Sequence, residues 1–175
     1  MALILPFGGK VPRIAASAYI APNATLIGDV EIGEDASVWF GCVLRADDGS
    51  IRVGARSNIQ DMTCIHLTGG YSNTLVGEDV TVGHGVILHG CTVEDRALVG
   101  MGSILLDQSV LGAGSVLGAG SLLTPRTVIA AGQLAHGRPA RAQRAVTEAE
   151  AQLGLFGARH YVETGRTYRA SENPD

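Results

Sequence analysis

The chain has 175 residues, a net charge of −4 and a sequence pI near 5.7. This length suits one folding unit with its own core, and no cluster of Lys and Arg resembles a nucleic-acid-binding stripe, so we expect no nucleic-acid partner. Hydrophobic residues make up 46% of the chain but aromatic residues only 5%, and there are 24 glycines. The interior must therefore be built from small aliphatic side chains and many tight turns, which favours an all-β or repeat architecture.

The chain opens with the apolar stretch MALILPFGG. It has no basic segment, and Pro6 interrupts the apolar run. We therefore expect neither a signal peptide nor a membrane span at this end, and no membrane partner.

Three cysteines, Cys42, Cys64 and Cys91, occur without a C-x-x-C pair. Their odd number and spacing suggest neither a disulfide framework nor a thiolate zinc site. We expect all three to be small core side chains in a protein of the reducing cytoplasm.

A six-residue repeat occupies most of the chain. An aliphatic residue returns from Ile14 to Ala135, and sixteen of the nineteen successive intervals are six residues long. The repeat is clearest in LGAGSVLGAGSL, residues 111–122. This period fits neither a helix nor simple strand alternation, but it suits a parallel β-helix whose short strands are separated by turns. We predict an all-β, parallel β-helix domain over residues 1–140.

Three intervals break the period, at residues 44–53, 65–76 and 88–93. Each lies beside a histidine or an acidic turn. Insertions in a solenoid become loops on one face, which is often the binding face. The interruptions therefore indicate where the functional site lies.

After residues 136–141, HGRPAR, the period stops and a helical pattern begins. Thr147 and Glu150 have the spacing of a capping box. We predict a C-terminal α-helix in the second region, residues 141–175, with frayed residues 171–175. Because three glycines weaken this helix in isolation, it must pack against the β-helix or a neighbouring subunit.

Three repeats make one coil, so equivalent residues of successive coils stack in columns about 4.8 Å apart. Counting by coils places Leu44, Ile65 and Leu88 on one face and Val38, Ile59 and Val82 on another. The residues that follow them by one and by two positions then form two columns along different edges: Arg45, His66 and His89 in one, and Phe40, Asp61 and His84 in the other. His66 and His89 can then converge on one atom, whereas His84 projects from another edge of the same prism.

Three imidazoles and an open fourth position match catalytic zinc sites, in which the metal lowers the pKa of bound water to about 7. A lone histidine is more often structural, but the registry of these residues favours a metal site. Zn²⁺ is the expected ion, although imidazole also suits Fe²⁺ and Co²⁺. A neighbouring subunit could supply His84, with Arg45 and Asp61 paired across the contact. Threefold symmetry closes such a head-to-tail contact, so we expect a homotrimer.

The repeat resembles that of the hexapeptide-repeat proteins, which form left-handed, triangular β-helices, over roughly residues 11–140. More specifically, LRADDGSIRVGARSNIQDMTCIH followed by VGHGVILHGC resembles the γ-class carbonic anhydrase family. The resemblance implies a trimeric zinc lyase in which zinc-bound hydroxide hydrates CO₂ reversibly to bicarbonate.

The resemblance also implies roles for single residues. It makes His66 and His89 the zinc ligands of one subunit and His84 the ligand from the next. The remaining implied roles are the interface ion pair for Arg45 and Asp61, the acid of an R-x-D turn for Asp47, the amide that positions zinc-bound solvent or bicarbonate for Gln60, and a helix residue reaching the site for Tyr161.

One part of the family pattern is missing. Active members carry a longer acidic loop after the first histidine, with a glutamate that shuttles protons, whereas HLTGGYSN, residues 66–73, contains no Asp or Glu. Asp48 takes the place of a second acid in the preceding turn and is the candidate shuttle, with no other carboxylate evident. Asp47 and Asp48 are equally typical of a plain Asp-Asp-Gly turn. We therefore expect an activity that is low, is conditional on oxidation or a partner, or is absent.

Three alternatives remain open. A hexapeptide acyltransferase using acetyl-CoA needs one histidine as general base, and not three in register. A CoA-thioesterase could use the same metal chemistry. A non-catalytic trimeric scaffold could keep the metal only as an assembly clamp.

Overall fold

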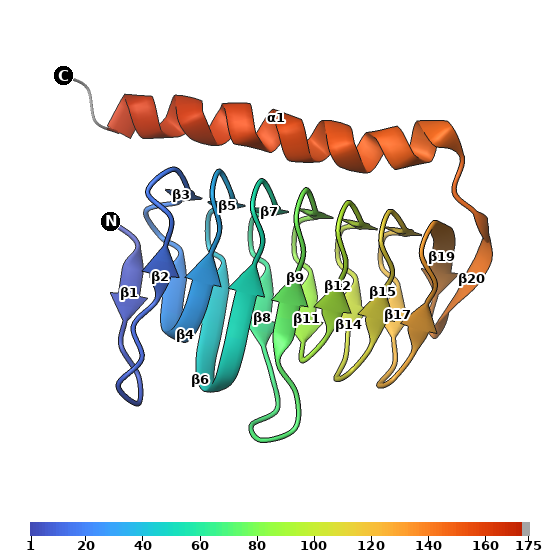
Figure 1. The fold of residues 1–175 in the computed structure, drawn as a ribbon, viewed down its shortest axis with the longest axis horizontal. Helices are drawn as coiled ribbons and strands as arrows, with labels where there is room; N and C mark the ends of the chain where they lie inside the picture. Colours follow the sequence, from blue (N-terminus) through green and yellow to red (C-terminus); the bar gives the residue numbers. More distant parts are fainter. Residues whose placement is uncertain (173–175) are drawn as a thin grey trace.

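The computed structural model describes residues 1–172, which form a three-sided parallel β-helix with one long helix, α1 (Glu148–Glu172), lying along it (Figure 1). Ser171 and Glu172 belong to α1, so the prediction that the frayed tail begins at residue 171 is wrong for these two. Residues 173–175 of that tail lie outside the described residues.

Two faces of the prism form one sheet, because two long strands, β4 (Thr25–Ile32) and β6 (Val43–Val53), run around the corner between them. The first face also contains β1 (Leu3–Leu5), β8 (Cys64–His66), β11 (Ile87–His89), β14 (Ile104–Leu105) and β17 (Leu122–Leu123). The second face also contains β2 (Arg13–Ile14), β9 (Thr74–Val76), β12 (Thr92–Val93), β15 (Val110–Leu111) and β18 (Val128–Ile129).

The third face is a separate sheet beneath α1. Its strands are β3 (Tyr19–Ile20), β5 (Ser37–Val38), β7 (Asn58–Ile59), β10 (Thr81–Val82), β13 (Leu98–Val99), β16 (Val116–Leu117), β19 (Gln133–Gly137) and β20 (Ala140–Ala145). Only β20 is antiparallel to its neighbour, and it continues the sheet beyond residue 140.

The pairing register confirms the predicted stacking of the inward-pointing residues. On the first face Leu44 pairs with Ile65, and Ile65 with Leu88. On the third face the corresponding column contains Val38, Ile59 and Val82. The side chains of both columns are fully buried in one continuous core. The residue after each inward-pointing side chain points outward, because side chains alternate along a strand.

Two local expectations differ from the structure. The interruption at residues 44–53 is not a loop but part of β6, whose pairing with β4 skips residues 47–50. Cys42 and Cys91 are buried as expected, but Cys64 is exposed. Cys64 comes directly before the buried Ile65, so strand alternation turns its side chain outward.

The capping box predicted at the start of α1 is present. The Glu150 carboxylate accepts the Thr147 backbone N–H at 2.8 Å, and the Glu150 N–H donates to the Thr147 hydroxyl at 3.3 Å. The glycine at 157 is explained by packing, because a Cβ there would lie 2.8 Å from the Thr81 hydroxyl. The helix therefore lies closer to the third face than a larger residue would permit.

Glu150 predicts a specific acid sensitivity. Its hydrogen bonds from Arg144 and Thr147 lower its pKa from 4.5 to about 2. Because the carboxylate is favoured in the folded state, its stabilising effect is present above about pH 4.5 and is lost as the pH falls toward 2. We expect Glu150→Gln to lack this pH-dependent stabilisation, so that its helix signal, measured by circular dichroism, changes less than that of the wild type between pH 5 and 2. The same acid transition in Glu150→Gln as in the wild type would contradict this role of Glu150.

Within residues 1–172, no helix combines the length and apolar character that crossing a bilayer requires.

Candidate metal centre

His66 and His89 lie side by side on the first face. They are the last residues of β8 and β11 and are paired in register. Their ring centroids are 5.3 Å apart, and His66 Nδ1 lies 3.4 Å from His89 Nε2. Both side chains are partly buried, with exposed fractions of 21% and 30%.

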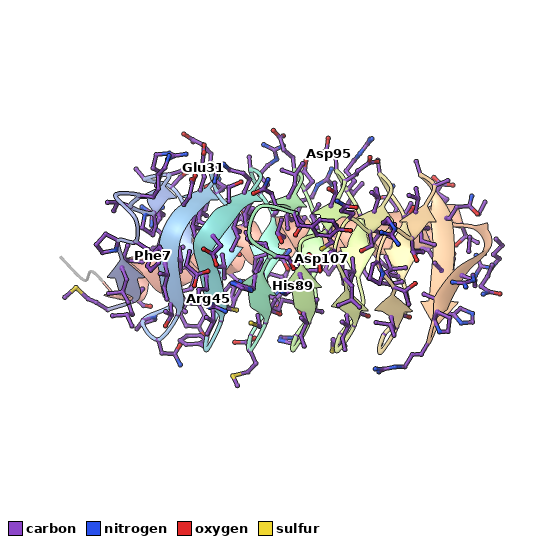
Figure 2. All side chains as sticks on the ribbon, turned by 90° about the horizontal axis from the view of Figure 1, so that it is seen from below. Phe7, Glu31, Arg45, His89, Asp95 and Asp107 are labelled. Atoms are coloured by element: carbon purple, nitrogen blue, oxygen red, sulfur yellow. The ribbon has the colours of Figure 1, made fainter. Side chains whose placement is uncertain are left out.

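The other nitrogen of each ring contacts a carboxylate. His66 Nε2 lies 3.0 Å from Asp47 Oδ1, and His89 Nδ1 lies 3.3 Å from Asp107 Oδ2. Figure 2 shows the labelled Asp107 beside His89 on this side of the prism. When each ring donates its proton to its carboxylate, the two facing nitrogens, His66 Nδ1 and His89 Nε2, are both unprotonated and each carries a lone pair. Two such lone pairs repel each other unless a cation or a donor lies between them.

The spacing of the facing nitrogens fits a shared metal ion. Two nitrogens bound to a tetrahedral zinc at roughly 2.0–2.1 Å lie about 3.3–3.4 Å apart, and the observed separation is 3.4 Å. Carboxylate partners on metal-bound imidazoles are a common means of orienting them. Among residues 1–172, no group of three or more His, Cys, Asp or Glu side chains is arranged to hold a metal ion. Within the described residues, one chain thus brings two imidazoles together at a spacing that suits a shared metal ion.

Asp47 joins Arg45 to His66. Its carboxylate pairs with the Arg45 guanidinium and with the His66 ring. Burial opposes the charge of Asp47, but the hydrogen bonds from His66 and Arg45 outweigh it and hold its pKa below the usual value. Asp47 is therefore a carboxylate acceptor at neutral pH, and it restricts the His66 ring.

Asp107 is a carboxylate beside the site that sequence reasoning missed, since no carboxylate other than Asp48 was evident from the sequence. The Asp107 carboxylate accepts hydrogen bonds from Ser72 at 2.6 Å and Thr68 at 3.2 Å, besides contacting His89. Burial raises its pKa, but these bonds together lower it below the usual value. The available signal was spacing, because Asp107 follows His89 by 18 residues, one regular coil.

His84 belongs to a second cluster, at the third face. It follows β10, its side chain is 45% exposed, and its Nδ1 lies 2.8 Å from Asp61 Oδ2. Burial and the charge of the nearby Asp61 both raise the pKa of Tyr161, which belongs to α1. The Tyr161 ring packs edge-on against Trp39 at 5.1 Å. His84 and Tyr161 thus both lie near Asp61, on the side of the third face and away from the sheet that carries His66 and His89.

Gln60 directly precedes Asp61 and is buried. Its amide Nε2 donates to Asn58 Oδ1 at 3.1 Å, and the Asn58 amide donates to the Thr81 hydroxyl at 3.1 Å. The Thr81 hydroxyl in turn donates to the Gly154 carbonyl of α1 at 3.1 Å. This chain of hydrogen bonds fixes the Gln60 amide relative to α1.

Asp48 is exposed at the skipped segment of β6 and packs against Gly69 of the loop between β8 and β9, which protrudes from the prism in Figure 1. Asp48 therefore lies on the side of His66 and His89. Arg45 and Asp61, expected to pair between subunits, do not pair within the chain. Arg45 binds Asp47, and Asp61 binds His84. The predicted residues thus form two separate clusters on one chain.

No protein-family model matches the chain. Among curated proteins, it is 52% identical to a carbonic anhydrase of Geobacillus kaustophilus, over 96% of this chain and 92% of that protein. The chain belongs to the γ-class carbonic anhydrase family. A gamma carbonic anhydrase of Arabidopsis mitochondria, gamma carbonic anhydrase 2, is 43% identical, and the chain spans 60% of its length while 94% of the chain is matched.

Solved structures that share this fold carry other names. A Bacillus cereus protein named as a putative acetyltransferase matches with a TM-score of 0.94 and 42% identity, over 97% of this chain and 98% of that one. A hexapeptide transferase family protein of Anaplasma phagocytophilum matches with a TM-score of 0.91 and 44% identity, over 95% and 98%. These matches support the hexapeptide-repeat fold predicted from the six-residue period.

Proposed function

We propose that this γ-class carbonic anhydrase family member catalyses the reversible hydration of CO₂ to bicarbonate, at metal centres between the subunits of a homotrimer. The proposal is carried by one observation: two imidazole nitrogens face each other at 3.4 Å, and each ring is backed by a carboxylate. Names of relatives at 43–52% identity support the reaction.

The metal is Zn²⁺ in this proposal, and Fe²⁺ or Co²⁺ also suits the imidazoles. His66 and His89 of one subunit would hold it together with His84 of a neighbouring subunit. Such an ion lowers the pKa of water to about 7 and so makes hydroxide available at neutral pH. The site then consists of two half-sites, His66 with His89 on one subunit and His84 on the next. In this proposal Arg45 and Asp61 pair across the subunit contact and bring the two half-sites together.

The side chains around the centre have separate tasks. Asp47 holds the His66 ring. The Gln60 amide, fixed by Asn58, positions solvent or bicarbonate. Tyr161 closes the site from α1. Asp48 moves the product proton from the site to the solvent, a role that its exposure permits.

A stopped-flow CO₂ hydration assay on protein of known metal content tests the function. We expect metal-dependent hydration, with kcat of Asp48→Ala about tenfold lower or more and kcat/KM little changed, because proton export follows CO₂ conversion. Imidazole buffer should restore the lost kcat. Asp95→Ala, an acid on a different turn whose carboxylate accepts the Glu78 N–H, is the control. Hydration by loaded wild-type protein no faster than by buffer would refute the function.

Acyl transfer is the second candidate, because the similar Bacillus cereus protein is named as an acetyltransferase. A general-base mechanism needs one histidine, and it gives no reason for two rings in register with their own carboxylates. Incubation of the wild-type protein with a panel of acyl-CoA thioesters, with and without an amine acceptor, separates transferase and thioesterase activity from CO₂ hydration.

A further inference from the structure

The loop between β8 and β9 is fastened, through one carboxylate, to the coil that lies two coils further along the prism. Asp107 accepts hydrogen bonds from the hydroxyls of Ser72 and Thr68, which lie at the two ends of this loop. The Ser72 hydroxyl also accepts the Thr68 N–H at 3.1 Å. Asp107 and the loop thus form one hydrogen-bonded unit, and His89 is the fourth member of it.

Two further contacts hold the tip of the loop. Gln108 Nε2 donates to the Tyr71 carbonyl at 3.3 Å, and Arg126 Nη1 donates to the Tyr71 hydroxyl at 3.5 Å. Both partners come from coils beyond the loop, on the same side as Asp107. The loop therefore lies against the coil that contains Asp107.

Gly90 provides the space in which these groups meet. Its φ is +64°, and a Cβ at this position would overlap both the Ser72 hydroxyl and the Asp107 carboxylate. Its N–H donates to the His66 carbonyl at 3.0 Å, and its carbonyl accepts the Gln108 N–H at 2.6 Å. A residue with a side chain at 90 would therefore separate Asp107 from the loop and disturb the turn directly after His89.

We propose that Asp107 is a positioning residue that fixes the orientation and tautomer of the His89 ring, and that Ser72 and Thr68 hold Asp107 in place for this purpose. A partly exposed imidazole can turn over, exchanging its two nitrogens. A carboxylate that accepts the Nδ1 proton favours the orientation in which Nε2 is unprotonated and faces His66. The metal-related part of this inference rests on the proposed function, but the orientation of the ring does not.

The orientation can be measured without metal or substrate. Long-range ¹H–¹⁵N NMR spectra of metal-free protein with labelled histidine, recorded at a pH where the ring is neutral, report its tautomer. We expect the Nδ1–H form of His89 in the wild type and a mixture in Asp107→Asn, whose single amide oxygen must serve all three donors. Asp95→Asn, with its carboxylate at a different edge of the prism (Figure 2), should keep the wild-type spectrum.

Zinc affinity provides the second readout. In competition with a chromophoric chelator, we expect Asp107→Asn to bind Zn²⁺ about 10–100-fold more weakly, with Ser72→Ala weakened in the same direction and Asp95→Asn unchanged. Circular dichroism of the metal-free variants checks that they are folded, and Ser72→Ala serves if Asp107→Asn does not fold.

The outcomes are distinct. Wild-type tautomer and zinc affinity in Asp107→Asn would overturn the inference, as would an equal loss of affinity in Asp95→Asn. A wild-type protein that binds no Zn²⁺ but has His89 in the Nδ1–H form, lost in Asp107→Asn, would contradict the proposed function and support this role of Asp107.

Discussion

We expect the His84→Ala variant to lose its bound metal and its CO₂ hydration activity, although His84 follows a strand of the third face and lies apart from the facing pair His66 and His89. The physical reason is that the pair supplies only two imidazoles, and the proposed third comes from another subunit. Loss of a direct ligand should weaken Zn²⁺ binding more than about 100-fold, since even outer partners of metal ligands contribute 10–100-fold. Metal content by mass spectrometry and the stopped-flow assay measure this effect.

Mixing two inactive variants tests whether the site is shared. A His66→Ala chain lacks the first half-site but keeps His84, and a His84→Ala chain has the opposite defect. In every mixed ring of three, one of the three contacts joins two intact half-sites, so random one-to-one mixing should restore about one quarter of the wild-type metal and activity.

The matched control is a mixture of His66→Ala with His89→Ala. Both substitutions damage the same half-site, so no contact in any mixed ring is intact and no activity should return. Recovery in this control, or wild-type metal content in His84→Ala alone, would contradict the shared site. A mass of 18.1 kDa by light scattering, that of one chain, would do so too.

Leu111→Ala should produce the largest loss of stability. Leu111 is fully buried in β15, between Val93 of β12 and Ile129 of β18. The coils above and below are joined to it by backbone hydrogen bonds and cannot close over the missing atoms. We expect the free energy of unfolding to fall by about 2–5 kcal/mol, measured by urea denaturation at fixed protein concentration.

Leu75→Ala is the matched control, because Leu75 lies on the same face, in β9, but is 46% exposed. Its substitution should cost about 1 kcal/mol or less. Equal losses in the two variants would show that the buried column does not determine stability.

The regular part of the fold was predictable because a solenoid is specified locally. Each coil repeats the same inward residue at intervals of six, so counting along the chain placed Leu44, Ile65 and Leu88 in one column. The predicted helix start was also correct, because a capping box is a contact between near neighbours. The prediction for Cys64 was wrong. Cysteine is a residue type that is usually buried, but the position of Cys64 in the strand turns its side chain outward.

Irregular segments were harder to predict. An interruption of the period predicts extra residues but not their conformation, and residues 44–53 form the continuous strand β6 where a loop was expected. Asp107 was missed because it lies in a regular coil, with no insertion and no histidine beside it in the sequence. Its importance arises only when the loop that contains Thr68 and Ser72 folds onto its coil.

By itself, the sequence determined the repeat, the buried column and the registry of His66 with His89, because these depend on a period that backbone hydrogen bonding repeats from coil to coil. Only the tertiary structure decided which carboxylate each imidazole contacts, that Asp61 binds His84 within the chain, and that Asp107 joins the loop to the histidine pair. Those contacts depend on side-chain directions and on the path of an irregular loop, which no period specifies.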